Sequence, residues 1–273
     1  MPKFTTSDGV SLHYTDEGQG VPVLCLSGLT RDGRDFDYVA PHLQDVRLIR
    51  LDYRGRGLSD WAPHETYSVP VEGKDALELL DHLGLEKAAV LGTSRGGLIA
   101  MLLAMVAKER LLGVALNDIG PEIAGPGLAA IKDYLGRNPV WKSFEEATRM
   151  MEQRMAGFDN IPEARWREEV EKHYREEAGR LVIRYDPKLR DAVLADWDQP
   201  LPDLWPMYDA LVDLPLCLIR GANSDLLTPE CFAEMTRRRP DAATATVADR
   251  GHIPFLDEPE AVQALTTWVT RLV

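Results

Sequence analysis

Apolar and polar residues alternate in two short stretches near the start of the chain, residues 3–6 and 10–15, with Asp8-Gly9 between them. Alternation with period two is typical of a half-buried strand, and Asp-Gly favours the tight turn of a hairpin. Residues 21–27 and 46–52 are then largely apolar, as strands inside a parallel sheet are. Helical spacing over 36–43 lies between these two stretches, so this region predicts a β-α-β unit.

The same alternation continues along the chain. Helical patterns cover 71–83 and 96–108, and strand-like runs cover 88–92 and 112–117. Strands at 214–219 and 243–247 and helices at 229–238 and 259–273 complete the series. Strands that alternate with helices predict an α/β fold with a mostly parallel sheet flanked by helices.

The stretch 121–211 interrupts this series. It contains no strand-like run, and amphipathic helical patterns cover 128–135, 144–155, 164–183 and 189–197. We therefore predict a core made of residues 1–120 and 212–273, with 121–211 as a helical insertion. Four of the six Trp and four of the eight Met lie in this insertion. They could line an apolar pocket, but we expect most of them to form the small core of a helical layer.

The net charge of the chain makes some classes of binding partner unfavourable. Lys and Arg number 31 against 44 Asp and Glu, which gives a net charge of -13 and a pI near 5.0. This excess repels phosphate backbones and anionic lipid, so we expect neither nucleic acid nor a membrane as partner. The first residues lack the apolar core of a signal peptide, and the longest apolar run, 97–107, is too short to span a bilayer. We expect a cytoplasmic protein with a small-molecule substrate, and no pattern specifies an oligomeric state.

Gly92-Thr-Ser94-Arg-Gly96 lies between a predicted strand and a predicted helix. In that context the pattern Gly-x-Ser-x-Gly is evidence for a nucleophile elbow, a sharp turn that needs glycine on both sides of the serine. Ser94 would stand at the carboxyl edge of the sheet, beside a helix N-terminus that favours negative charge.

A serine hydroxyl needs a base, and the base needs an orienting carboxylate. Both candidates follow later strands, which gives the chain order Ser94, Asp225, His252. Asp118 in Leu-Asn-Asp-Ile-Gly also follows a strand and is the alternative acid. We prefer Asp225, because a helix start at Thr228-Pro229 fixes the exit of its loop.

These motifs together resemble the α/β-hydrolase superfamily over nearly the whole chain. The elbow at 92–96, the acid loop at 220–229, the histidine loop at 251–259 and the loop at 52–60 each resemble the family's pattern, and the insertion falls where the family has its cap. The resemblance implies an α/β-hydrolase fold with a helical cap and a catalytic triad of Ser94, Asp225 and His252.

One motif differs from the family pattern. The oxyanion loop usually begins His-Gly, whereas this chain has Ser27-Gly28-Leu29. The resemblance implies that the backbone N–H groups of Leu29 and Arg95 form the oxyanion hole, because the donors are main-chain groups. A serine nucleophile in place of aspartate argues against the dehalogenase and epoxide hydrolase branches.

Other motifs point to no cofactor. Gly55-Arg-Gly57 lacks the third glycine of a dinucleotide fingerprint, and the histidines have no metal-ligand spacing. The three cysteines are far apart in sequence, so we expect no disulfide framework. The sequence predicts a serine hydrolase that cleaves a carboxylic ester or lactone without cofactor or metal. The alternatives are a C–C bond hydrolase acting on a diketone, and a ligand-binding sensor with slow turnover.

Overall fold

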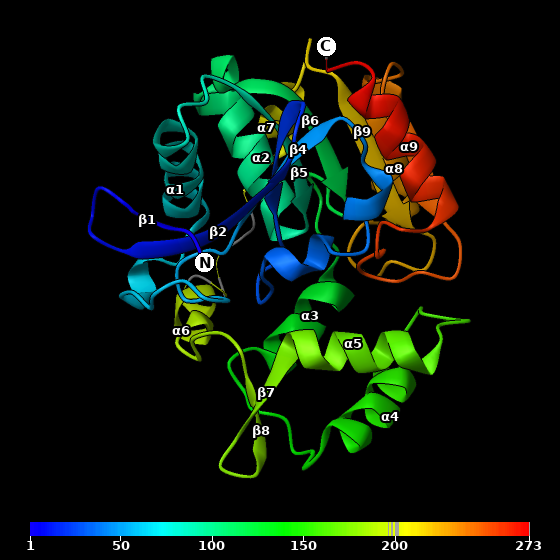
Figure 1. Cartoon of the computed structure of the whole chain (residues 1–273). Helices are drawn as coiled ribbons and strands as arrows, with labels where there is room; N and C mark the ends of the chain where they lie inside the picture. The colour runs from blue at the N-terminus through cyan, green and yellow to red at the C-terminus, as the bar shows by residue number, and fades with distance from the viewer. Residues whose placement is uncertain (196, 198, 200–201, 273) are drawn as a thin grey trace.

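The computed structural model describes residues 1–195, 197, 199 and 202–272. An eight-stranded sheet runs through the molecule in the order β1-β2-β4-β3-β5-β6-β9-β10 (Figure 1). Its strands are β1 (Lys3–Thr5), β2 (Ser11–Gly18), β3 (Val21–Leu26), β4 (Val46–Leu51), β5 (Ala88–Thr93), β6 (Leu111–Asn117), β9 (Leu216–Gly221) and β10 (Ala243–Val247). Strands β1 and β2 pair antiparallel, as does β2 with β4, and the other pairs are parallel. The predicted α/β-hydrolase fold with a mostly parallel sheet is confirmed.

Helices cover both faces of the sheet. Strand β3 shows why, since Leu24 and Leu26 belong to one buried cluster and Val23 and Cys25 to another. The first face packs against α1 (Val69–His82), α2 (Arg95–Val106), α7 (Trp205–Asp209) and α8 (Pro229–Arg238), and the second against α9 (Pro259–Val269). A strand buried on both faces carries few polar residues, so the central strands could be predicted from the sequence.

The predicted helix at 36–43 is wrong. The structure has two 3-10 helices there, η1 (Gly33–Phe36) and η2 (Ala40–His42). Asp32 caps the first, because its side chain accepts a hydrogen bond from the N–H of Arg34. Pro41 has no N–H to donate and so cannot continue an α-helix from residue 36. Two other 3-10 helices are η3 (His64–Thr66) and η4 (Lys108–Arg110).

The inserted segment contains α3 (Gly125–Tyr134), α4 (Phe144–Arg154), α5 (Glu163–His173) and α6 (Leu189–Leu194). The predicted helix at 189–197 is thus shorter, and residue 196 lies outside the described part. The predicted helix at 164–183 ends at His173, and a hairpin of β7 (Tyr174–Glu177) and β8 (Arg180–Ile183) follows. Ala178 and Gly179 both have positive φ, 50° and 73°, which suits a two-residue hairpin turn. The expectation that the insertion holds no strand is therefore wrong.

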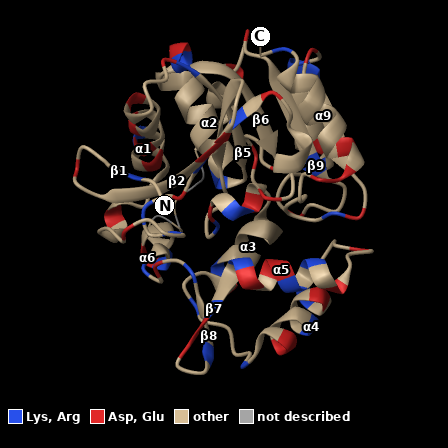
Figure 2. Cartoon of the chain, in the orientation of Figure 1, with Lys and Arg blue, Asp and Glu red and all other residues tan. Residues whose placement is uncertain are grey.

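Helices α3, α4 and α5 lie over the end of the sheet at which the parallel strands finish (Figure 1). Charges of both signs interleave along α5, whereas α2 carries almost none (Figure 2). This contrast follows burial, since α2 is packed between the sheet and α1 and α5 has a solvated face. Within the described ranges, every helix is too short or too polar to cross a membrane.

Candidate active site

Ser94 forms the turn between β5 and α2. Its backbone has φ 49° and ψ -110°, a left-handed conformation that costs a serine free energy. The turn is held from both sides: the N–H of Ser94 donates to the carbonyl of Asn117 at 3.0 Å, and its own carbonyl accepts from Gly97 at 2.9 Å. The surrounding structure therefore fixes the strained backbone that carries the hydroxyl.

Glycine is needed on both sides of this serine for the reason that the sequence suggested. A Cβ on Gly92 would lie 2.5 Å from the carbonyl carbon of Gly96. A Cβ on Gly96 would overlap the carbonyl oxygen of Leu26 in the neighbouring strand. The helix consequently starts in close contact with the ends of β3 and β5.

His252 lies on the loop after β10 and contacts the serine. Its Nε2 is 3.0 Å from Ser94 Oγ, and its Nδ1 is 2.7 Å from Asp118 Oδ2. A proton on Nδ1 leaves Nε2 free to accept from the hydroxyl, and the carboxylate favours this tautomer. The three side chains form a continuous line of hydrogen bonds.

Asp118 directly follows β6 and is completely buried. Its Oδ1 accepts the N–H of Gly221 at 2.7 Å, and its Oδ2 accepts from Ser224 Oγ at 2.6 Å in addition to His252. A carboxylate accepts hydrogen bonds at both oxygens, and here three donors share them. The contacts with Gly221 at the end of β9 and with Ser224 in the loop after it fix the orientation of the carboxylate toward the imidazole.

The prediction that Asp225 pairs with His252 is wrong. Asp225 is exposed, and its backbone carbonyl accepts a hydrogen bond from the N–H of Gly127 at 3.1 Å. Strands β6 and β9 are adjacent and parallel, so both acids follow strands that end at the same edge of the sheet. The loop after β9 turns Ser224 toward Asp118, which leaves the next side chain pointing outward.

Sequence analysis missed Ser224. Its hydroxyl also accepts the N–H groups of Leu226 and Leu227, so it links the loop backbone to Asp118. A serine beside a turn is common in any chain, and no pattern distinguishes this one.

The loop that holds Leu29 is attached to the nucleophile turn. The N–H of Gly96 donates to the carbonyl of Ser27 at 3.1 Å, and the N–H of Arg31 donates to the carbonyl of Gly28. Because the peptide after Gly28 is trans, the N–H of Leu29 points away from that carbonyl. Among the described residues, neither Leu29 N–H nor Arg95 N–H donates to a backbone acceptor. Both predicted donors therefore remain available to a ligand.

A buried cluster of ion pairs contacts the residues that carry these two N–H groups. Glu72 is fully buried and contacts Arg56 at 2.9 Å and Arg95 at 2.6 Å. Arg56 also donates from Nε to the carbonyl of Leu29 at 3.0 Å. The loop at 52–60, singled out in the sequence, thus supplies the residue that joins the Leu29 loop to the start of α2.

A cavity lies beside His252, between the sheet edge and the insertion. Trp166, Met151 and Met155 line its apolar wall, together with Phe158 and Phe255. The other Trp and Met residues of the insertion do not line it, and Trp166 also packs in the cluster of buried residues between α4 and α5. Met151 belongs to that cluster too and Met155 packs against it, so the pocket and packing interpretations both hold for these three residues. In the described ranges, no group of three His, Cys, Asp or Glu is arranged to hold a metal ion.

Comparison with known proteins gives matches over nearly the full length. The model of the alpha/beta hydrolase family matches residues 23–265. The 3-hydroxybutyrate-oligomer hydrolase of Cupriavidus necator is 35% identical over 250 residues, 88% of this chain and 85% of that protein. Esterase YbfF of Escherichia coli is 25% identical over 255 residues, 88% and 89% of the two chains. The crystal structure of an alpha/beta hydrolase from Novosphingobium aromaticivorans superposes with a TM-score of 0.91 at 34% identity, and covers 99% of this chain and 97% of that one.

Proposed function

Since the chain belongs to the alpha/beta hydrolase family, we propose that it is a serine hydrolase that cleaves a carboxylic ester or lactone through an acyl-enzyme. The observation that carries the proposal is the line of hydrogen bonds from Ser94 Oγ to His252 at 3.0 Å and from His252 to Asp118 at 2.7 Å. A nucleophile, a base and an orienting acid in this geometry suit attack on a carbonyl carbon.

In the acylation step, His252 Nε2 takes the proton of the Ser94 hydroxyl as Oγ bonds to the carbonyl carbon. The carbonyl oxygen becomes an oxyanion, and the N–H groups of Leu29 and Arg95 stabilise it. The bond from carbon to the leaving oxygen then breaks, and that oxygen takes the proton from the imidazolium. Asp118 stays ionised throughout and stabilises the transient charge on the ring.

Deacylation repeats the sequence with water. His252 takes a proton from water as the water oxygen attacks the acyl carbon. The bond to Ser94 Oγ breaks, Oγ recovers the proton, and the carboxylic acid leaves. No step needs a metal ion or a cofactor.

Two relatives support the choice of an ester. One is named a 3-hydroxybutyrate-oligomer hydrolase and the other an esterase. C–C bond hydrolysis of a diketone and slow-turnover ligand sensing are the alternatives, and both would use the same fold. The two alternatives predict different substrates or a different number of turnovers per enzyme molecule.

The test measures turnover of p-nitrophenyl esters of increasing chain length, lactones and vinylogous diketones, with fluorophosphonate labelling to count active sites. We expect repeated turnover of esters or lactones, and labelling of one serine. Ser94→Ala should lose both the labelling and about 10⁴-fold or more in kcat. Ser68→Ala is the matched control, because the Ser68 hydroxyl has no hydrogen bond among the described residues. Less than one turnover would support the sensor, and selective cleavage of diketones would support the C–C hydrolase. Near-normal turnover by Ser94→Ala would overturn the proposal.

A further inference from the structure

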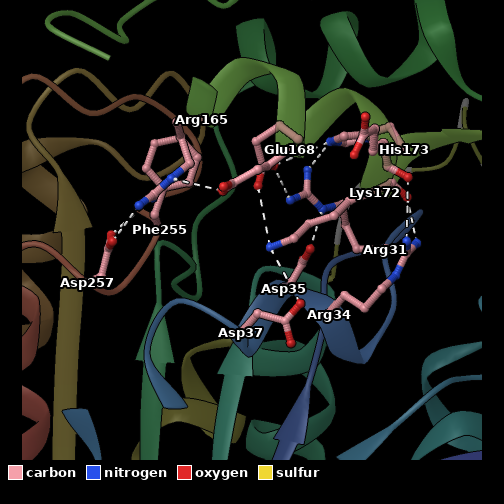
Figure 3. A network of polar contacts seen from close by, with 12 residues as sticks. Arg31, Arg34, Asp35, Asp37, Arg165, Glu168, Lys172, His173, Phe255 and Asp257 are labelled. Carbon is pink, nitrogen blue, oxygen red and sulfur yellow. Dashed lines mark hydrogen bonds and ion pairs between the residues drawn. The ribbon is translucent and has the colours of Figure 1, made fainter. Parts of the chain in front are cut away.

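The cavity beside His252 is lined by polar as well as apolar side chains, and we call its polar part the polar end. Arg31, Asp35, Glu169 and His173 line that end. Figure 3 shows Arg31 close to Asp35 and His173. Arg31 lies between the two acids, since its Nε donates to Asp35 Oδ1 at 2.7 Å and its Nη2 to Glu169 Oε2 at 2.6 Å. Because these two nitrogens belong to one guanidinium, the two carboxylates lie next to each other. Asp35 belongs to η1 and Glu169 to α5, so the core and the insertion each contribute one acid.

Each of these carboxylates has a second oxygen that accepts no hydrogen bond among the described residues, although Glu169 Oε1 lies 3.8 Å from Lys172 Nζ. Among the described residues, Asp35 Oδ2 and Glu169 Oε1 have no hydrogen-bond partner, although both atoms are buried. The two side chains are only 7% and 4% exposed. The hydroxyl of Tyr38, which also lines the cavity, is buried and forms no hydrogen bond of good geometry in the described structure, but burial and the nearby carboxylates of Glu169 and Glu168 raise its pKa. Lys172 Nζ, beside Glu169, has no hydrogen-bond partner among the described residues either. A buried polar atom without a partner costs free energy, so this group of atoms favours a polar ligand in the cavity.

The charged side chains at this end of the cavity disfavour a charged ligand of either sign. Lys172 Nζ lies 3.8 Å from Glu169 Oε1 and over the ring of Tyr38, so Arg31 and Lys172 are both close to the two acids. Figure 3 shows Lys172 and Arg31 beside Asp35. A carboxylate ligand would face the unpartnered oxygens of Asp35 and Glu169. An ammonium ligand would face Arg31 and Lys172. A neutral group that can donate a hydrogen bond avoids both repulsions.

Burial also affects the protonation of the acids. It raises the pKa of Asp35 to about 6, with Glu169 adding to the shift, whereas Arg31 and the other neighbouring cations hold the pKa of Glu169 well below its usual range. At pH 7.5 both carboxylates are mainly ionised and act as acceptors. The cavity therefore offers strong acceptors together with apolar Met and aromatic side chains.

We propose that this polar end of the cavity is a subsite for a hydroxyl group of the substrate, which makes hydroxylated esters the substrate class. This inference rests on the proposed function, because the hydroxyl is placed in a molecule whose ester group reacts beside His252. The hydroxyl donates to the free oxygen of Glu169 or Asp35 and can accept a hydrogen bond from Tyr38.

A hydrogen bond to a buried charged group predicts a preference of about 10- to 100-fold in kcat/KM over an ester that lacks the hydroxyl. The probes are ethyl 2-hydroxybutanoate and ethyl 3-hydroxybutanoate against ethyl butanoate, which place the hydroxyl on the acyl side. The pair 3-hydroxybutyl acetate and butyl acetate places it on the alcohol side. Each enzymatic ratio is divided by the ratio of the uncatalysed rates in alkaline buffer, which removes differences in intrinsic reactivity.

Variants locate the effect. Glu169→Gln and Asp35→Asn should lower the preference, and Tyr38→Phe, which removes a single oxygen, tests the site without disturbing the ion pairs. Glu171→Gln is the matched control, since this glutamate is exposed on the same helix and pairs with Arg167. We expect the control to keep the wild-type ratio. Rates on ethyl butanoate and thermal melting report whether each variant is folded.

The outcomes separate this inference from the proposed function. If the wild-type protein turns over plain and hydroxylated esters equally in every set, the inference fails and the proposed function stands. If it turns over none of them, both fail. A preference that persists unchanged in both Glu169→Gln and Asp35→Asn, or that disappears equally in Glu171→Gln, would also overturn the subsite.

Discussion

Replacing Asp118 by asparagine tests the hydrogen-bonded line at its most informative point. The amide has almost the same shape as the carboxylate, but one of its two acceptor atoms becomes a donor. Asp118 now accepts at both oxygens, from Gly221 on one and from Ser224 and His252 on the other. An asparagine cannot satisfy both sides.

The magnitude follows from its two orientations. If the amide oxygen faces Gly221, the NH₂ faces His252 and selects the tautomer with the proton on Nε2, which cannot accept the proton of Ser94. If the oxygen faces His252, the NH₂ opposes the N–H of Gly221, where the donor and acceptor are now 2.7 Å apart. An unpaired buried donor costs about 1–3 kcal/mol, so the active orientation is the minor one. Loss of the negative charge beside the imidazolium adds to this, and we expect kcat to fall by about 10³- to 10⁴-fold.

The assay is initial-rate turnover of p-nitrophenyl butyrate, with the active fraction counted by fluorophosphonate and stability followed by urea unfolding. Asp225→Asn is the matched control, because Asp225 is exposed and its side chain has no hydrogen bond among the described residues. We expect its rate to stay within about threefold of wild type. A folded Asp118→Asn with near-normal kcat, or a large loss in Asp225→Asn, would refute the assignment of the acid.

Three further predictions concern the surroundings of the site. Ser224→Ala removes a 2.6 Å hydrogen bond to Asp118 and should lower kcat by about 3- to 30-fold in the same assay, and an unchanged rate would mean that the other contacts suffice to orient the acid. Gly96→Ala should lose about 3 kcal/mol or more of free energy of unfolding in urea, because the added methyl overlaps the carbonyl of Leu26; a wild-type midpoint would contradict the close contact. Burial raises the pKa of the thiols of Cys25, Cys217 and Cys231, that of Cys231 to about 11. A disulfide reagent at pH 8 should therefore label no thiol in the native protein and three after unfolding, and rapid labelling of the native protein would contradict this.

The sequence alone determined the order of strands and helices in the core. The central strands are buried on both faces, so they are continuously apolar and stand out from the amphipathic helices between them. The elbow at Ser94 was also legible, since the same close contacts that shape the turn exclude every side chain at Gly92 and Gly96. Burial and close backbone contacts restrict which residues a position can hold, so both can be inferred from the sequence.

Errors arose where local pattern conflicts with local backbone geometry. The amphipathic pattern continues from α5 into the hairpin of β7 and β8, and only the left-handed pair Ala178-Gly179 ends it. A helix and a short polar hairpin with one buried face can carry the same residues, because both place an apolar side chain inward every few positions. The secondary structure of the insertion is thus set by its packing over the core.

Only the tertiary structure identified which aspartate pairs with His252 and which residues line the cavity. Asp118 and Asp225 both follow parallel strands at one edge, and the choice between them depends on which loop turns its carboxylate inward. The polar end of the cavity combines Arg31 and Asp35 with Glu169, more than 130 residues later in the chain. Charges far apart in sequence carry no shared periodicity, so their pairing appears only when the packing of the insertion on the sheet buries them together.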